Sequence, residues 1–330
     1  MNSDGPVLII TSEIDVASDL VIHNLQARNV EVFRFNSEIF PTSARISCSA
    51  SDGATQVKLF DGYGRNVDPS RVRSGYFRKP QAPRIDGAIE DDLHRSFALA
   101  ESRALISNVT RSLEAPWLNN PDRMRVGEHK FLQLRLASRL GLAIPRTIMT
   151  NSASEAIEFA HNCPSGLIAK TLSSPILRTD PPLYIYTNEL SESDITRLDL
   201  MRYAPCILQE LVDKQSDIRV TVVGAKVFAA EILSQNHPAA SVDWRRISQA
   251  GIPYLKHQLP DAVESRCIEL VSRMGLNYGA IDLAYSKNGT YLFLECNPNG
   301  EWGWIEQTTG MKLSEEIGRL LATPSLIANH

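Results

Sequence analysis

The stretch from Ala280 to Asn297 constrains this chain more than any other, because two apolar strand patterns flank Asn288-Gly289. Asn-Gly between alternating apolar residues is the strongest short signal for a two-residue hairpin turn. Such a turn places Lys287 opposite Thr290 and defines the register of both strands. The sequence therefore predicts an antiparallel hairpin whose facing residues can be counted.

Counting back from the turn brings acidic side chains together. Asp282 falls directly opposite Glu295, and Asn297, two residues further on, points from the same face. Opposed carboxylates repel by several tenths of a kcal/mol up to ~1 kcal/mol, and a divalent cation between them reverses that sign. Three oxygen ligands favour a hard ion such as magnesium, with room for water and phosphate. The alternative is a solvated sheet face, although Ala280 and Ala284 leave space above it.

Two lysines are the second candidate feature. Lys170 stands inside the apolar run Leu167–Leu172, where an ammonium is costly unless an anion meets it. Lys130 opens a helical pattern, and alone it would be an ordinary surface residue. Together they are suited to an anionic ligand.

A third feature is the strand and turn Ile207–Asp213, followed by Asp217 and Arg219. Its amide and carboxylate groups could present hydrogen-bonding partners to an adenine edge and a ribose, or could belong to an edge strand and a polar loop. Arg219 is expected on a strand, where a guanidinium suits a phosphate or carboxylate. The adjacent Arg245 and Arg246 have the same chemistry.

The N-terminal part has a different pattern. Val7–Ile10, Asp15–Arg28 and Val30–Phe35 read as strand, helix and strand, the start of a parallel α/β layer. The glycine spacing of a dinucleotide site is absent, so we expect a Rossmann-like layer without that site. Breaks at Pro116–Pro121 and at Ala204-Pro205 predict three segments. These are residues 1–118, 119–204 and 205–330.

Composition narrows the class of protein. The chain has 330 residues, a net charge of −4 and no strongly basic tract, which argues against a general nucleic-acid binder. Its five cysteines are far apart without C-x-x-C spacing, which predicts free thiols and no zinc or disulfide framework. We see no export signal and no apolar stretch long enough to span a membrane. A cytoplasmic location is expected.

With these residues in place, the chain resembles the ATP-grasp superfamily. Within it, the sequence looks most like the ribosomal peptide maturases that cross-link microviridin-type precursors, also called graspetides, and is more distantly similar to RimK-type glutamate ligases. The most specific stretch is Leu294–Glu306, with its Glu-x-Asn-Pro run. Further matching stretches are Tyr76–Pro80, Trp117–Asn119, Gln209–Val212, Asp217–Arg219 and Asp243–Arg246. The resemblance implies an α/β fold with an N-terminal Rossmann-like pre-ATP-grasp domain, a central α+β domain and a C-terminal domain with a mixed or antiparallel sheet.

The resemblance also implies roles for particular residues. The nucleotide-binding set is Lys130, Lys170, Gln209, Glu210, Leu211, Val212 and Asp217, with the hinge that contacts adenine at Glu210 and Val212. The cations for the transferring phosphate or the substrate carboxylate are Arg219 and one of Arg245 or Arg246. The ligands of magnesium, with two ions expected, are Asp282, Glu295 and Asn297. One departure is Thr171–Ile176, which lacks the glycines of the usual phosphate lid.

The implied reaction forms an acyl phosphate from ATP and a carboxylate, which a hydroxyl or amine then attacks. Our leading hypothesis is macrocyclisation of a precursor peptide whose leader binds around Tyr184–Leu190 and the following helix. The alternatives are a ligase that adds amino acids to a small acceptor or protein tail, and a non-catalytic nucleotide-binding partner. The resemblance further implies a homodimer.

Overall fold

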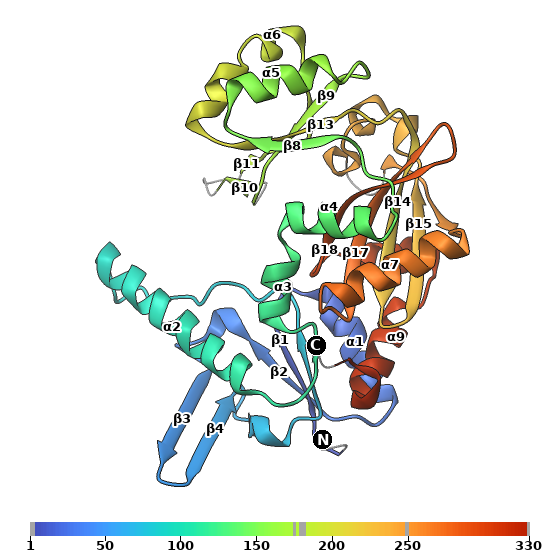
Figure 1. Ribbon diagram of the computed structural model, residues 1–330. Helices are drawn as coiled ribbons and strands as arrows, with labels where there is room; N and C mark the ends of the chain where they lie inside the picture. Colours follow the sequence, from blue (N-terminus) through green and yellow to red (C-terminus); the bar gives the residue numbers. More distant parts are fainter. Residues whose placement is uncertain (1–3, 174–175, 178–182, 248–250, 329–330) are drawn as a thin grey trace.

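The structure is a computed structural model that describes residues 4–173, 176–177, 183–247 and 251–328. Figure 1 shows three parts stacked along one direction, with the first and last segments of the chain side by side at one end. Within the described residues, no helix is long and apolar enough to cross a membrane.

The N-terminal part is built on a parallel sheet in the order β2-β1-β6-β7. Its strands are β1 (Val7–Thr11), β2 (Val32–Asn36), β6 (Ser74–Phe77) and β7 (Trp117–Leu118). Helix α1 (Val16–Ala27) connects β1 to β2, as the strand-helix-strand pattern predicts. All five residues of β1 are buried, and the first four are apolar, because a parallel strand is buried on both faces.

Two further elements extend from this part in Figure 1. The hairpin of β3 (Arg45–Ser51) and β4 (Ala54–Phe60) turns at Gly53, whose φ is +78°, and β4 also pairs with β5 (Asn66–Val67). Helix α2 (Asp92–Ser112) begins at Asp92 because Asp91 caps it, its side chain accepting a hydrogen bond from the His94 amide.

The central part is a small antiparallel sheet with helices beside it. Two helices lead into it, α3 (Pro121–Gly127) and α4 (Lys130–Arg139). The sheet order is β12-β9-β13-β8. Its elements are β8 (Thr147–Thr150), α5 (Ala153–His161), β9 (Leu167–Lys170), β12 (Asn188–Glu189), α6 (Glu192–Ile195) and β13 (Cys206–Glu210). A separate two-stranded ladder pairs β10 (Ile176–Leu177) with β11 (Leu183–Tyr184).

The C-terminal part is a five-stranded antiparallel sheet in the order β16-β15-β14-β17-β18, with α7 on one face. The strands are β14 (Lys214–Val223), β15 (Lys226–Ile232), β16 (Tyr254–His257), β17 (Tyr278–Ser286) and β18 (Tyr291–Asn297). The helices are α7 (Asp261–Arg273), α8 (Gly303–Thr309) and α9 (Leu313–Ala322).

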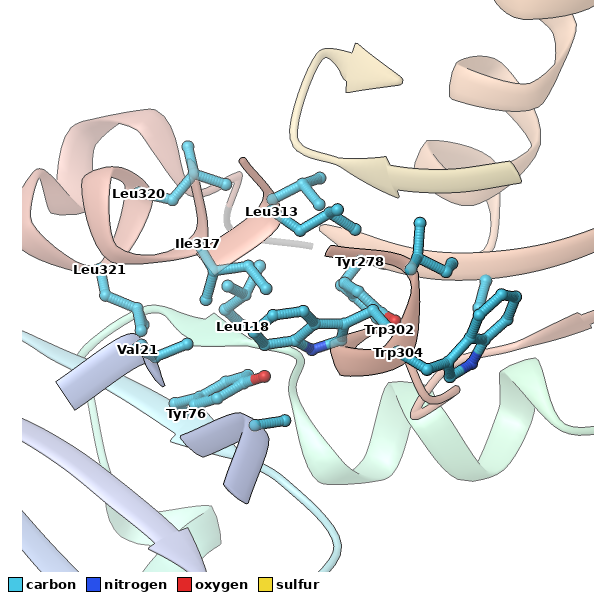
Figure 2. Close-up of a cluster of buried hydrophobic side chains, with 14 of the residues drawn as sticks. Val21, Tyr76, Leu118, Tyr278, Trp302, Trp304, Leu313, Ile317, Leu320 and Leu321 are labelled. Carbon is cyan, nitrogen blue, oxygen red and sulfur yellow. The ribbon is translucent and has the colours of Figure 1, made fainter. Parts of the chain in front are cut away.

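A single buried cluster joins the two ends of the chain. Figure 2 shows Tyr76 and Leu118 of the N-terminal sheet packed with Tyr278, Trp302 and α9. Because this core is shared, the N-terminal sheet and the C-terminal sheet are held together by apolar burial rather than by a flexible linker.

The three-segment division remains a proposal, and the sheet pairing bears on its second boundary. Strand β13 pairs with β8 and β9 in the central sheet, not with the C-terminal sheet. The boundary expected at residues 204–205 would therefore move beyond Glu210, where the chain crosses to β14.

Candidate active site

The predicted pair at the hairpin is confirmed, although the predicted turn is wrong. Asp282 on β17 lies opposite Glu295 on β18. Lys287 is not opposite Thr290: the turn has three residues and is closed by Ser286 and Thr290. One extra residue on β18, Leu294, then bulges out and restores the register at the acidic pair. The longer turn and the bulge each shift the expected register by one residue, in opposite directions, so the two shifts cancel.

The acidic pair belongs to a row that crosses three strands. Strand β17 lies between β18 and β14, and Asp282 is paired with Glu295 on β18 and with Arg219 on β14. The Nε of Arg219 lies 3.0 Å from Asp282 Oδ1. Burial raises the pKa of Asp282, and Glu295 adds to that rise while Arg219 opposes it. Burial also acts to raise the pKa of Glu295, but the nearby cations, Arg245 first, outweigh it and leave that pKa well below its usual range. The row thus holds two carboxylates of unequal acidity.

Asn297 completes an all-oxygen set on this face. It lies opposite Ala280, two pairs further along the ladder and therefore on the same face, and its Oδ1 accepts a hydrogen bond from the Asn299 amide at 2.9 Å. Among the described residues no group of three or more His, Cys, Asp or Glu side chains could hold a metal alone. Two carboxylates and an amide are too few to enclose an ion. This set suits magnesium, which keeps water and phosphate oxygens as its other ligands.

Both lysines point into this region, from different parts of the chain. Lys130 Nζ lies 3.5 Å from Glu295 Oε2 and donates to the carbonyl of Thr171 at 3.0 Å. Lys170 Nζ donates to Gln209 Oε1 at 2.7 Å. Burial lowers the pKa of Lys170 to about 8, against the opposing effect of Glu295. An ammonium in such a site gains most from an anionic ligand.

Two adjoining cavities meet at Lys170, Arg245 and Glu295. The narrower one lies between the central and C-terminal sheets and has apolar walls from Ile168, Leu211 and other residues. The wider one, of about 410 Å³, includes Lys130 and Asn297. A narrow, largely apolar slot beside a wider cavity with cationic and acidic side chains is suited to a nucleotide base and its phosphates.

The expected nucleotide residues are not all in the slot. Gln209, Leu211, Val212 and Asp217 line it, whereas Glu210 is not among its lining residues. The amides of Glu210 and Leu211 are already used, donating to the carbonyls of Arg146 and Gly166. The Glu210 amide is therefore not free to contact adenine, which leaves its carbonyl and its side-chain carboxylate.

Lys214 is a residue that sequence reasoning missed. Its Nζ donates to Asp217 Oδ1 at 2.9 Å and to the carbonyl of Val242 at 3.2 Å, inside the slot. Strand alternation would place residues three apart on opposite faces. A bulge between Lys214 and Ser216 changes the parity and puts both charges on one face. The nearby Asp217 therefore already has a cationic partner.

The structure separates the two candidate arginines. Arg245 lines both cavities, and its Nη1 donates to Glu295 Oε1 at 3.2 Å. Arg246 lines neither and donates instead to Thr187 O and Asn188 Oδ1. Asp243, also unassigned from the sequence, fixes Arg245 with hydrogen bonds at 2.8 and 3.0 Å. Only Arg245 is placed to reach a ligand beside Glu295.

The segment that replaces the glycine-rich lid starts at this chamber. Leu172 and Ser173 line the wider cavity beside Lys130. Residues 174–175 and 178–182 lie outside the described part of the chain, so the predicted contacts of the lid are not placed there.

Comparison with known families identifies the fold family. A RimK-like ATP-grasp domain matches residues 128–321, and an MvdD pre-ATP grasp domain matches residues 6–125. The chain belongs to the ATP-grasp ligase family. Its three-part ATP-grasp architecture, with a Rossmann-like first part, is the one that the resemblance implied.

Two solved structures resemble this ATP-grasp chain over nearly its full length. One is the macrocyclase MdnC from Microcystis aeruginosa, bound with the precursor peptide MdnA, with 30% identity and a TM-score of 0.85 over 96% of this chain and 98% of that one. The other is a RiPP-associated ATP-grasp ligase from Chryseobacterium gregarium in complex with ADP and a leader and core peptide. It has 28% identity and a TM-score of 0.89 over 96% of both chains.

The curated relatives of this ATP-grasp chain are named as glutamate ligases rather than macrocyclases. A probable alpha-L-glutamate ligase from Pasteurella multocida is 26% identical over 217 residues. That match covers 63% of this chain and 66% of the relative, so the chain spans just under two thirds of its length.

Proposed function

We propose that this chain activates side-chain carboxylates of a ribosomally made precursor peptide as acyl phosphates and joins them to Ser or Thr hydroxyls or to Lys amines. The products are macrocycles closed by ω-esters or ω-amides. The observation that carries this proposal is full-length likeness: two peptide-bound ATP-grasp ligases align over 96% of the chain, including its N-terminal part. The glutamate ligase match covers much less.

The site supports the first half of the reaction. Lys130, Lys170 and Arg245 all line the wide cavity, together with Glu295. In our proposal these three cations surround the γ-phosphate of ATP while the substrate carboxylate attacks it, and they offset charge spread over its oxygens. ADP leaves, and the carboxylate is left as an acyl phosphate.

Magnesium fits the oxygen set of Asp282, Glu295 and Asn297, and when bound it would supply positive charge to the phosphate oxygens. Arg219 holds Asp282 in place from the neighbouring strand. In the second half, the acceptor oxygen or nitrogen attacks the acyl carbon, phosphate departs, and the acceptor loses one proton. No covalent bond to the protein is needed.

The proposed leader site is the segment around Tyr184–Leu190. Within it, Asn188 and Glu189 form the edge strand β12 of the central sheet, and the short helix α6 follows, capped by Ser191. The Thr187 amide donates to Asp243 Oδ2 at 3.1 Å, and Asp243 also binds Arg245. A peptide lying along this edge would therefore be connected to the site through Thr187, Asp243 and Arg245.

Mass spectrometry with a cognate precursor tests the proposal. We expect loss of one water per bond formed, with ATP and magnesium both required. Removal of the leader should abolish the reaction, and unchanged turnover would exclude the leader site. A precursor that never loses water in the presence of active enzyme would refute macrocyclisation.

The second candidate is ligation of free amino acids to a small acceptor or a protein tail. The curated glutamate ligase relatives favour it. The same experiment with glutamate and a generic acceptor separates the two, because the acceptor gains an amino acid residue. A homodimer and a cytoplasmic location remain predictions.

A further inference from the structure

Three buried amide and guanidinium side chains meet the chain on either side of Asn297. We call residues 296–300 the ligand loop, since they directly follow Glu295 and contain Asn297. The three side chains are Gln133, Asn119 and Arg78, each at most 2% exposed. Buried polar side chains need partners, so the partners that they have are informative.

Gln133 binds the first residue of the ligand loop. Its Nε2 donates to the Cys296 carbonyl at 2.7 Å, and its Oε1 accepts from the Cys296 amide at 2.9 Å. Cys296 lies between the two proposed ligands, Glu295 and Asn297. The same helix, α4, carries Lys130 one turn earlier, so it serves the site at both positions.

Asn119 binds the middle of the ligand loop. Its Nδ2 donates to the carbonyls of Pro298 and Tyr278, at 2.9 and 2.8 Å, and its Oδ1 accepts from two amides at the start of β17. One side chain thus ties the loop after β18 to the beginning of β17, the strand that carries Asp282.

Arg78 binds the end of the ligand loop. Its Nη1 donates to the carbonyls of Asn299 and Gly300 at 3.0 and 2.9 Å, and its Nη2 to Glu301 Oε2 at 2.8 Å. Tyr278 adds its hydroxyl to the Gly300 carbonyl at 2.8 Å. Gly300 has no room for a larger side chain, because a Cβ there would lie 2.4 Å from the Cβ of Ala280.

Arg78 and Asn119 come from matching positions of the N-terminal sheet. Arg78 directly follows β6 and Asn119 directly follows β7, and these parallel strands are neighbours. Their carboxyl ends form the edge at which Rossmann-like sheets usually bind a ligand. In this chain that edge instead holds the ligand loop, through the shared core in Figure 2.

We propose that Gln133, Asn119 and Arg78 are positioning residues that fix Glu295 and Asn297 for divalent-cation binding. The inference rests on the proposed metal assignment and extends it to the N-terminal part. Side chains that orient metal ligands change metal affinity typically 10–100-fold when replaced, because the ligands then lose their preset geometry. None of the three needs to touch the ion.

The test measures Mn²⁺ affinity by electron paramagnetic resonance in the presence of ADP, so that no turnover is required. Gln133→Met removes the hydrogen bonds to the first residue of the ligand loop, and Arg78→Lys changes those to its last residues. Both substitutions nearly preserve the side-chain volume. Each should weaken Mn²⁺ binding by about 10–100-fold and leave metal-free ADP binding unchanged. Arg73→Lys is the matched control, because Arg73 binds Gly5 and Ala322 at the same junction but not the ligand loop.

The outcomes are distinguishable. Unchanged Mn²⁺ affinity in folded Gln133→Met or Arg78→Lys overturns the positioning role. Equal weakening in Arg73→Lys would also overturn it, since that indicates general loosening of the junction. Glu295→Gln serves as the direct reference: if it too leaves Mn²⁺ binding unchanged, the metal assignment itself fails. If one of the two variants does not fold, the other decides.

Discussion

Arg219 Nε lies 3.0 Å from Asp282 Oδ1, at directly paired positions of adjacent strands in the middle of the sheet. Both residues are buried, at 6% and 8% exposure. Asp282 is therefore held between a cation on one strand and the acidic Glu295 on the other. This relationship links the stability of the sheet to the chemistry of the site.

Arg219→Met should lower both stability and activity. Removing one partner of a buried ion pair typically costs 3–5 kcal/mol, about the loss expected here, because the other charge is left uncompensated. Urea unfolding would measure the loss. The double variant Arg219→Met/Asp282→Asn should recover part of the stability but not the activity. Equal instability of the single and double variants would contradict this account.

Glu295→Gln should remove catalysis while the protein still binds nucleotide. The neutral amide keeps the shape but lowers the negative charge that a divalent cation needs, so turnover should fall by at least ~100-fold. Product analysis and ADP titration on the same preparation would measure both properties. Retained biological activity in this variant would instead support the non-catalytic nucleotide-binding alternative.

Arg245→Ala and Arg246→Ala form a matched pair of adjacent substitutions. Arg245 contacts Glu295, whereas Arg246 contacts the main chain of Thr187 and the side chain of Asn188. We expect Arg245→Ala to reduce kcat by ~10²–10³-fold, the usual loss of an electrostatic stabiliser. Arg246→Ala should change kcat much less. The reverse order would assign the phosphate-facing role to Arg246.

Asp243 should make stability fall in acid. Burial alone would raise its pKa, but hydrogen bonds from Arg245 and from the Thr187 amide lower it to about 2. A carboxylate with a lowered pKa stabilises the fold above its unfolded value of 3.8, and that contribution disappears as the pH falls towards 2. The contribution is roughly 2 kcal/mol. In Asp243→Asn, the difference in unfolding free energy between about pH 6 and about pH 2 should shrink accordingly; an unchanged difference would refute it.

The site was predictable from the sequence where its geometry is local. Hairpin counting placed Asp282 opposite Glu295 correctly, but only because the error in the turn length and the bulge at Leu294 cancel; Lys130 does open α4 as expected. The turn length was misjudged because Asn-Gly favours two-residue turns, whereas Ser286 here uses its hydroxyl to accept the Thr290 amide and close a three-residue turn.

Other features depend on contacts between distant segments. Nothing in the spacing of Lys214 and Asp217 shows that a bulge places them on one face. Arg245 and Arg246 are adjacent in one short 3-10 helix, and only the tertiary structure shows which of them points towards Glu295. Gln133, Asn119 and Arg78 come from three separate segments and look like ordinary polar residues until their shared partner, the ligand loop, is placed beside them.

The sequence by itself determined the periodic elements and the ATP-grasp family, because these depend on short-range patterns and on one specific run around Glu295. The tertiary structure alone decided how the pieces meet. Burial of Trp302, Tyr76 and α9 in one core brings the edge of the N-terminal sheet onto the ligand loop. Most buried polar groups in a folded protein are hydrogen-bonded, and that requirement selects contacts that no local pattern encodes.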